Sequence, residues 1–215
     1  MFALVCRLLV LWSVVFYSQQ IAVAADAPAP LATPLDSLSE RLSGFDQITG
    51  EFQQQLFSED GALLQESEGR YALLRPGYLR WHIATPEEQI LVAAGDSLWH
   101  YDVELETANE RPIASGDPTN PLTIVGGEPQ ALAEFYTVSQ DDADHFTLRP
   151  RFADAEFSQV DLLFDGQLPA TLEVEDQLGR RTLIRFVTSD VDTSLKPEDF
   201  TFTPPEGVDV YQHDR

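Results

Sequence analysis

The chain has 215 residues, with 13 Lys and Arg against 36 Asp and Glu, and its formal net charge is −23 at pH 7. A charge this negative excludes ordinary nucleic-acid binding, which needs clustered cations that face phosphates. Hydrophobic residues make up 43% of the chain and aromatic residues 10%, which is enough for one sizeable core and excludes a wholly disordered chain. The single cysteine, Cys6, lies near the start. A processed chain would therefore hold no thiol for a disulfide, a zinc site or a nucleophile.

Residues 1–25 have the pattern of a cleaved secretory signal peptide. Arg7 precedes an apolar run over residues 8–16, and Ala22-Val23-Ala24 supplies the small residues that signal peptidase accepts, with cleavage after Ala24 or Ala25. The alternative is an uncleaved anchor, but the apolar run is shorter than the roughly 20 residues that a membrane span needs. Cys6 precedes the apolar run, whereas a lipoprotein cysteine follows it. We predict an exported chain that is not itself acylated, with a flexible linker over residues 26–34 and a single domain over residues 35–215.

The charged residues leave two interpretations open. After residue 25 the cations are 11 Arg and one Lys, Lys196, among many acids. Such self-repulsion would be screened in a saline habitat, and a melting temperature that did not rise with NaCl would contradict that interpretation. Drift in base composition is the alternative, since it replaces Lys by Arg without selection on charge.

One helix and then a long series of strands are predicted. Leu35, Leu38, Leu42 and Phe45 recur at spacings of three and four, which predicts a helix that begins near Pro34. From Ile48 the hydrophobic period becomes two. Turn signals then separate ten predicted strands, which cover approximately residues 48–56, 62–75, 78–83, 89–94, 98–103, 135–139, 146–150, 157–164, 170–175 and 183–188. Between the fifth and sixth strands, we expect a helical piece that includes residues 121–125 and a short helix that begins at Pro129.

The strand series predicts a mainly β fold: an incomplete, strongly curved antiparallel barrel whose mouth is covered by the few helices. Phe52, Trp81, Trp99 and Tyr101 are expected to form one apolar wall. Such a wall fits either a ligand cavity or an ordinary packed core, and the strand count does not decide between them.

The sequence lacks the common catalytic patterns. The four histidines lack the spacing of a helical zinc site, and the chain has neither a G-x-S-x-G elbow nor a glycine-rich phosphate loop. Asp141, Asp142, Asp144 and His145 lack the ligand spacing of a calcium loop, so we interpret them as a solvated hairpin turn. We therefore predict no enzyme, no catalytic residue, no metal and no cofactor.

Several motifs, in order along the chain, resemble the LolA family of periplasmic lipoprotein carriers. The motifs are Leu74-Arg75-Pro76-Gly77-Tyr78-Leu79-Arg80-Trp81, Pro86 with Gln89-Ile90-Leu91-Val92, Gly95-Asp96-Ser97-Leu98-Trp99-His100-Tyr101-Asp102, Asn120-Pro121-Leu122-Thr123-Ile124-Val125, Phe146-Thr147-Leu148-Arg149-Pro150, and Phe200-Thr201-Phe202-Thr203-Pro204-Pro205-Glu206-Gly207-Val208. The resemblance implies a monomeric carrier whose apolar cavity, under a lid of helices, takes the acyl chains of lipoproteins. It also implies that the carrier accepts them from the inner-membrane transporter LolCDE and passes them to the outer-membrane acceptor LolB.

The resemblance assigns roles to particular residues. Arg75 would hydrogen-bond main-chain carbonyls of the lid and hold the empty carrier closed, which suits the five donors of a guanidinium group. Leu42, Leu122 and Val125 would be the apolar residues of the lid. The wall that binds acyl chains would consist of Phe52, Leu79, Trp81, Ile83, Val92, Trp99 and Tyr101. Leu79 and Leu122 stand where the family often has Phe, so the cavity is expected to be roomier or differently shaped.

Two other functions stay open at this stage. The same β fold could carry a free lipid or glycolipid, although the motif from Phe200 to Val208 resembles the lipoprotein-carrying branch. A periplasmic hydrolase is the third possibility, and it would need an acid–base pair in a cleft.

Overall fold

The structure is a computed structural model that describes residues 32–113, 122–152 and 155–212. The chain from Ala32 onward forms one compact unit. The predicted signal peptide and most of the predicted linker lie outside the described residues. No helix of the described ranges is both long enough and apolar enough to span a membrane.

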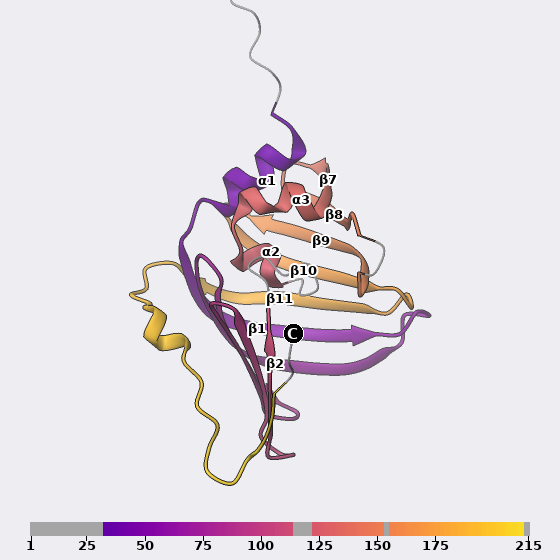
Figure 1. Cartoon of the computed structure of the whole chain (residues 1–215). Coiled ribbons are helices and arrows are strands. Elements are labelled where there is room, and N and C mark those ends of the chain that lie inside the picture. The colour runs from indigo at the N-terminus through magenta and orange to yellow at the C-terminus, as the bar shows by residue number, and fades with distance from the viewer. Residues whose placement is uncertain (1–31, 114–121, 153–154, 213–215) are drawn as a thin grey trace, which may run out of the picture. The chain divides into compact units, whose positions relative to one another are not determined.

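Twelve strands of the described chain form one sheet (Figure 1). They are β1 (Gln47–Phe57), β2 (Leu63–Leu74), β3 (Tyr78–Thr85), β4 (Gln89–Ala94), β5 (Ser97–Asp102), β6 (Thr107–Pro112), β7 (Tyr136–Asp142), β8 (His145–Pro150), β9 (Phe157–Asp165), β10 (Leu168–Asp176), β11 (Arg181–Asp190) and β12 (Asp209–Gln212). Their order in the sheet is β12-β6-β5-β4-β3-β2-β1-β11-β10-β9-β8-β7. All neighbours are antiparallel except β12, which runs parallel to β6.

The sheet is open, because β12 and β7 are its two edges and do not pair with each other. Two bulges help it to curl, one between Glu51 and Phe52 and one between Glu68 and Gly69. A Cβ at Gly69 would lie 1.9 Å from the carbonyl oxygen of His82, so only glycine allows this close approach of two strands. The prediction of a mainly β, strongly curved and incomplete antiparallel barrel is confirmed.

Short helices lie together on one side of this sheet (Figure 1). They are α1 (Pro34–Leu42), α2 (Leu122–Gly126), the 3-10 helix η1 (Pro129–Ala131) and α3 (Leu132–Phe135). Thr33 caps α1, since its hydroxyl accepts a bond from the backbone N–H of Asp36, whose carboxylate accepts one from the Thr33 backbone N–H in return. A second 3-10 helix, η2 (Pro197–Phe200), contacts β3 and β4.

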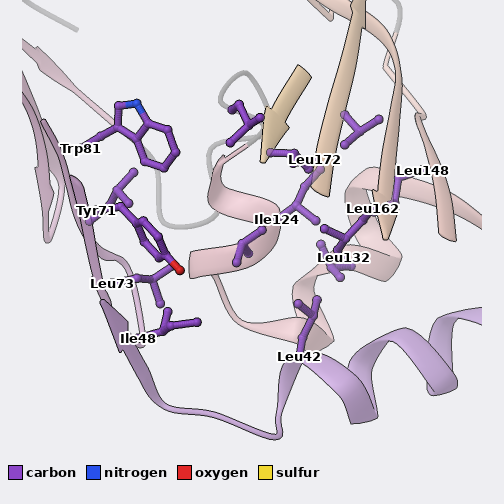
Figure 2. Packing of buried hydrophobic residues seen from close by; sticks show 14 of the residues in the cluster. Leu42, Ile48, Tyr71, Leu73, Trp81, Ile124, Leu132, Leu148, Leu162 and Leu172 are labelled. Atoms are coloured by element: carbon purple, nitrogen blue, oxygen red, sulfur yellow. The ribbon is translucent and has the colours of Figure 1, made fainter. Parts of the chain in front are cut away.

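Buried apolar side chains fill the space between the helices and the sheet. Figure 2 shows Ile48, Tyr71, Leu73 and Trp81 on one side of this core and Leu132, Leu148, Leu162 and Leu172 on the other, with Ile124 of α2 between the two groups. Leu148, Leu162 and Leu172 have no exposed surface. The helices therefore pack on both halves of the curled sheet.

All ten predicted strands are present, but sequence patterns missed β6 and β12. β6 contains Asn109 and Glu110 and ends at Pro112, residue types that are depleted in strands. β12 has four exposed residues at an edge of the sheet, so burial imposes no period-two pattern on it. The short helix expected from Pro129 is present as η1, which α3 continues.

Candidate functional site

The inner face of the sheet carries three aligned rows of apolar residues across β1 to β5. Side chains that are directly opposite in neighbouring antiparallel strands share a face. One row is Ile48, Leu73, Leu79, Ala93 and Leu98; the next holds Tyr71, Trp81 and Leu91; the third holds Phe52, Gly69 and Ile83. Phe52 stacks on Trp81 with ring centroids 3.7 Å apart. The result is a continuous apolar surface on one half of the sheet.

The other half of the sheet presents a matching apolar surface from β8, β9 and β10. Phe146 and Leu148 of β8, Val160 and Leu162 of β9 and Leu172 of β10 are all fully buried. The two surfaces belong to one cluster of buried residues. A surface hollow of about 420 Å³ is lined by Glu51, Phe52, Gln53, Glu68, Gly69, Arg70, His82, Ala84 and Val187. Five of these nine residues have charged or polar side chains, which suit an acyl chain poorly, so the buried apolar interior is the better candidate site.

We call α1, α2, η1 and α3 together the lid, because they cover this interior. Leu38 and Leu42 of α1 have no exposed surface, and Ile124 and Val125 of α2 are at most 4% exposed. Leu122 is half-buried and packs against the same cluster. Of the three predicted lid residues, Leu42 and Val125 thus belong to the buried cluster and Leu122 packs against it.

Arg75 joins the end of β2 to the lid. Its Nε and Nη2 both donate to the carbonyl oxygen of Val125, at 3.2 and 2.6 Å, and its Nη1 donates to that of Phe45 at 3.0 Å. The guanidinium carbon lies 4.3 Å from the centroid of the Phe45 ring. The backbone N–H of Gly77 adds a bond to the carbonyl of Gly126, at 3.2 Å. One side chain therefore binds both α2 and the segment that follows α1.

The charge of Arg75 is held in a mostly buried place. Burial lowers the pKa of Arg75 to about 10, while the nearby carboxylate of Asp46 favours the charged form. The group is still protonated at neutral pH. A buried cation is costly unless its donors are used, so the carbonyls of Val125 and Phe45 are needed as long as the lid is shut.

The structure separates the seven predicted wall residues into two groups. Phe52, Leu79 and Trp81 belong to the interior cluster, and Ile83 packs against it. Val92, Trp99 and Tyr101 are on the opposite face of the sheet. Val92 is directly opposite Arg80 and Trp99, and Trp81 is directly opposite Leu91. Because neighbouring residues of a strand point to opposite faces, Val92 and Trp99 lie on the face that Trp81 and Leu91 do not share.

The outer face of β3 to β5 is covered by the C-terminal segment. The ring of Phe202 lies 5.4 Å from that of Trp99 and 5.5 Å from that of Tyr101. Arg80 donates to the carbonyls of Asp199 and Thr201, which fixes the segment in place. Val92, Trp99 and Tyr101 are therefore left out of the acyl-chain wall that is proposed below.

The acidic residues of the β7–β8 hairpin show how a solvated turn is organised. Asp141, Asp142 and Asp144 are exposed, as expected for such a turn, whereas His145 is half-buried and contacts Asp161. Asp161 of β9 is more enclosed: burial raises its pKa, but hydrogen bonds from Gln159, Thr147 and His145 outweigh this and leave the pKa lowered. In the described part of the chain no group of three or more His, Cys, Asp or Glu side chains is placed to hold a metal ion.

Sequence reasoning missed two polar residues that organise the site. Arg41 of α1 donates to carbonyls in the turns that follow β7 and β9. The Tyr71 hydroxyl donates to the carbonyl of Thr188 and is also hydrogen-bonded to the Ser189 hydroxyl. Burial raises the pKa of Tyr71. Arg41 could have been noted as a cation in the last turn of a helix, but its partners lie more than 100 residues away.

Comparison with known proteins shows to which family this chain belongs. The family described as "Outer membrane lipoprotein carrier protein LolA" matches residues 43–203. The outer-membrane lipoprotein carrier protein of Chromohalobacter salexigens is 33% identical over 88% of this chain and 94% of its own length. That of Alcanivorax borkumensis is 32% identical over 87% of this chain and 95% of its own length. The chain belongs to the LolA family.

A solved structure agrees on the fold. A LolA superfamily protein from Nitrosomonas europaea aligns with a TM-score of 0.51 at 13% identity, over 79% of this chain and 96% of its own. At that identity the likeness speaks for the fold alone.

Proposed function

We propose that this protein is a periplasmic carrier of lipoproteins, which holds their acyl chains in the apolar interior beneath the lid. The observation that carries the proposal is the lid itself. Apolar residues of the lid pack into the buried cluster, and Arg75 donates to the carbonyl of Val125 in α2 and to that of Phe45, just after α1. Membership of the LolA family supports the same conclusion.

The energetics explain why acyl chains need a carrier. Burial of one methylene is worth about 0.8 kcal/mol, so a chain of about sixteen carbons is unfavourable in water by about 12 kcal/mol. Ile124 and Val125 of α2 belong to the same buried cluster as the rows on β1 to β3, so we propose that an entering acyl chain displaces α2 from these rows. Part of the burial energy is then used to break the bonds of Arg75.

This arrangement also gives a route to release. The carrier has to hand over its cargo without an energy source of its own, so its affinity has to stay below that of the acceptor. Bonds that re-form when the lid closes, those of Arg75 to Val125 and Phe45, favour the empty state and lower the net affinity for cargo. We propose LolCDE as the donor and LolB as the acceptor, in keeping with the family. The proposed carrier acts as a monomer, needs no cofactor and is not an enzyme.

The proposal is tested in spheroplasts that are depleted of their own carrier. The full-length chain is expressed and newly made lipoproteins are followed. We expect them to appear in the medium in a one-to-one complex with the exported protein. Retention of lipoproteins on the inner membrane, with the protein folded and exported, would contradict the proposal and favour a carrier of free lipid.

A further inference from the structure

Arg41 makes an unusually complete set of contacts for a residue in a lid helix. Its Nη1 donates to the carbonyl of Gly166, in the turn between β9 and β10. Its Nη2 donates to the carbonyl of Ala143 at 2.9 Å and pairs with the Asp144 carboxylate at 2.6 Å, in the turn between β7 and β8. The guanidinium carbon lies 5.5 Å from the centroid of the Phe164 ring.

These contacts tie the end of α1 to two hairpins at once. The hairpins are themselves joined, because the backbone N–H of Phe164 donates to the carbonyl of Asp144 at 2.9 Å. The Arg41 side chain is 20% exposed and that of Asp144 is 56% exposed, so water screens the ion pair and the hydrogen bonds to the two turns carry the contact. A planar guanidinium is suited to several acceptors in one plane, which a lysine ammonium would not match.

The position of Arg41 in the chain relates it to Arg75. Arg41 lies in the last turn of α1, and its carbonyl accepts a bond from the backbone N–H of Gly44 at 3.1 Å. The next residue is Phe45, whose carbonyl and ring both contact Arg75. A fixed end of α1 therefore fixes the partner that Arg75 needs.

We propose that Arg41 is a positioning residue for the Arg75 latch: it clamps the end of α1 to the β7–β8 and β9–β10 turns and so holds Phe45 against Arg75. The inference rests on the proposed carrier function and adds a residue to which that function gave no role.

The test measures the effect of Arg41→Leu in the wild-type protein and in the Arg75→Leu variant. Lipoprotein-loaded carrier is mixed with membranes that contain the acceptor, and the rate of transfer to the membranes is measured. We expect Arg41→Leu to slow transfer at least fivefold when Arg75 is present and to add less than twofold when Arg75 is already Leu. Arg41→Lys should restore transfer only in part. Equal slowing in both backgrounds would show a merely structural role and overturn the proposal.

Arg149→Leu is the matched control. Arg149 lies on β8, at the end of the strand away from the β7–β8 turn, and donates to the side chain of Gln159. This variant should transfer lipoprotein at the wild-type rate. If Arg149→Leu slowed transfer as much as Arg41→Leu, the effect would belong to lost surface charge and the positioning role would be refuted.

A second measurement needs no cargo and so separates the two proposals. Hydrogen exchange is followed in the cargo-free protein, purified after expression of the full-length chain. Arg41→Leu should raise exchange several-fold in residues 43–46 and also in α2, which it does not touch, because the bonds of Arg75 weaken. Exchange that rises in α1 alone would overturn the clamp. If Arg41→Leu shows the expected exchange pattern but the wild-type protein takes up no lipoprotein, the positioning role of Arg41 stands and the proposed carrier function is refuted.

Discussion

Replacement of Arg75 by leucine should convert the carrier into a trap for its cargo. The guanidinium group binds two carbonyl oxygens, those of Val125 and Phe45. A hydrogen bond to a charged group contributes about 1.5–3 kcal/mol, and a contact with an aromatic face adds about 0.5–2 kcal/mol. After the cost of burying the cation, we take about 3 kcal/mol as the loss for the closed, empty state. That corresponds to roughly 150-fold in the equilibrium between open and closed lid.

Two assays check this value. Urea unfolding of the cargo-free variant should give a free energy of unfolding lower by about 3 kcal/mol, because the closed state is the native state. In the transfer assay, Arg75→Leu should accept lipoproteins but keep them when acceptor membranes are added. Physically, a closed state that is less stable competes less well with the loaded state, so the affinity for cargo rises.

The matched control is Arg70→Leu. Arg70 lies on β2, the strand that leads to Arg75, but its side chain is 79% exposed and its pair with Glu51 is long, at 3.8 Å. The Arg70→Leu variant should keep the free energy of unfolding and the transfer rate near the wild-type values, since exposed ion pairs contribute little. Transfer by Arg75→Leu at the wild-type rate, in a folded protein, would refute the latch and the reasoning behind it.

Three further predictions address the wall, the core and the pH dependence. Trp81→Ala should lower the retention of lipoprotein at least tenfold, whereas Trp99→Ala, on the outer face, should change it less than twofold in the same assay; equal losses would contradict the assignment of faces. Leu162→Ala should reduce the free energy of unfolding by about 2–5 kcal/mol in urea titrations, because this side chain is fully buried. The lowered pKa of Asp161 stabilises the fold above its ordinary value of 3.8, and this contribution is lost as the pH falls through the folded-state pKa. Asp161→Asn should therefore cost stability at pH 7 but little at pH 2, and a constant difference across that range would contradict the assignment.

Strand β3 shows how much of the sheet the sequence can predict. The alternation along this strand is enough to place Leu79, Trp81 and Ile83 on one side and Tyr78, Arg80 and His82 on the other, because a strand with one buried face has a period of two. The same rule applied within β5, where Trp99 and Tyr101 share a face. What the rule cannot give is the phase between two strands, since a shift of register by one residue exchanges the faces.

By itself, the sequence determined the order of the ten patterned strands, the first helix, and the ordered series of motifs that resembles the LolA family. These are local patterns, because hydrophobic period and turn residues act over a few positions. Only the tertiary structure decided that Phe202 covers Trp99, that Arg75 meets Val125, and that Arg41 meets Gly166. The residues of each pair lie 103, 50 and 125 positions apart. Such contacts depend on how far the sheet curls, which the sum of many weak packing terms sets and no single motif encodes.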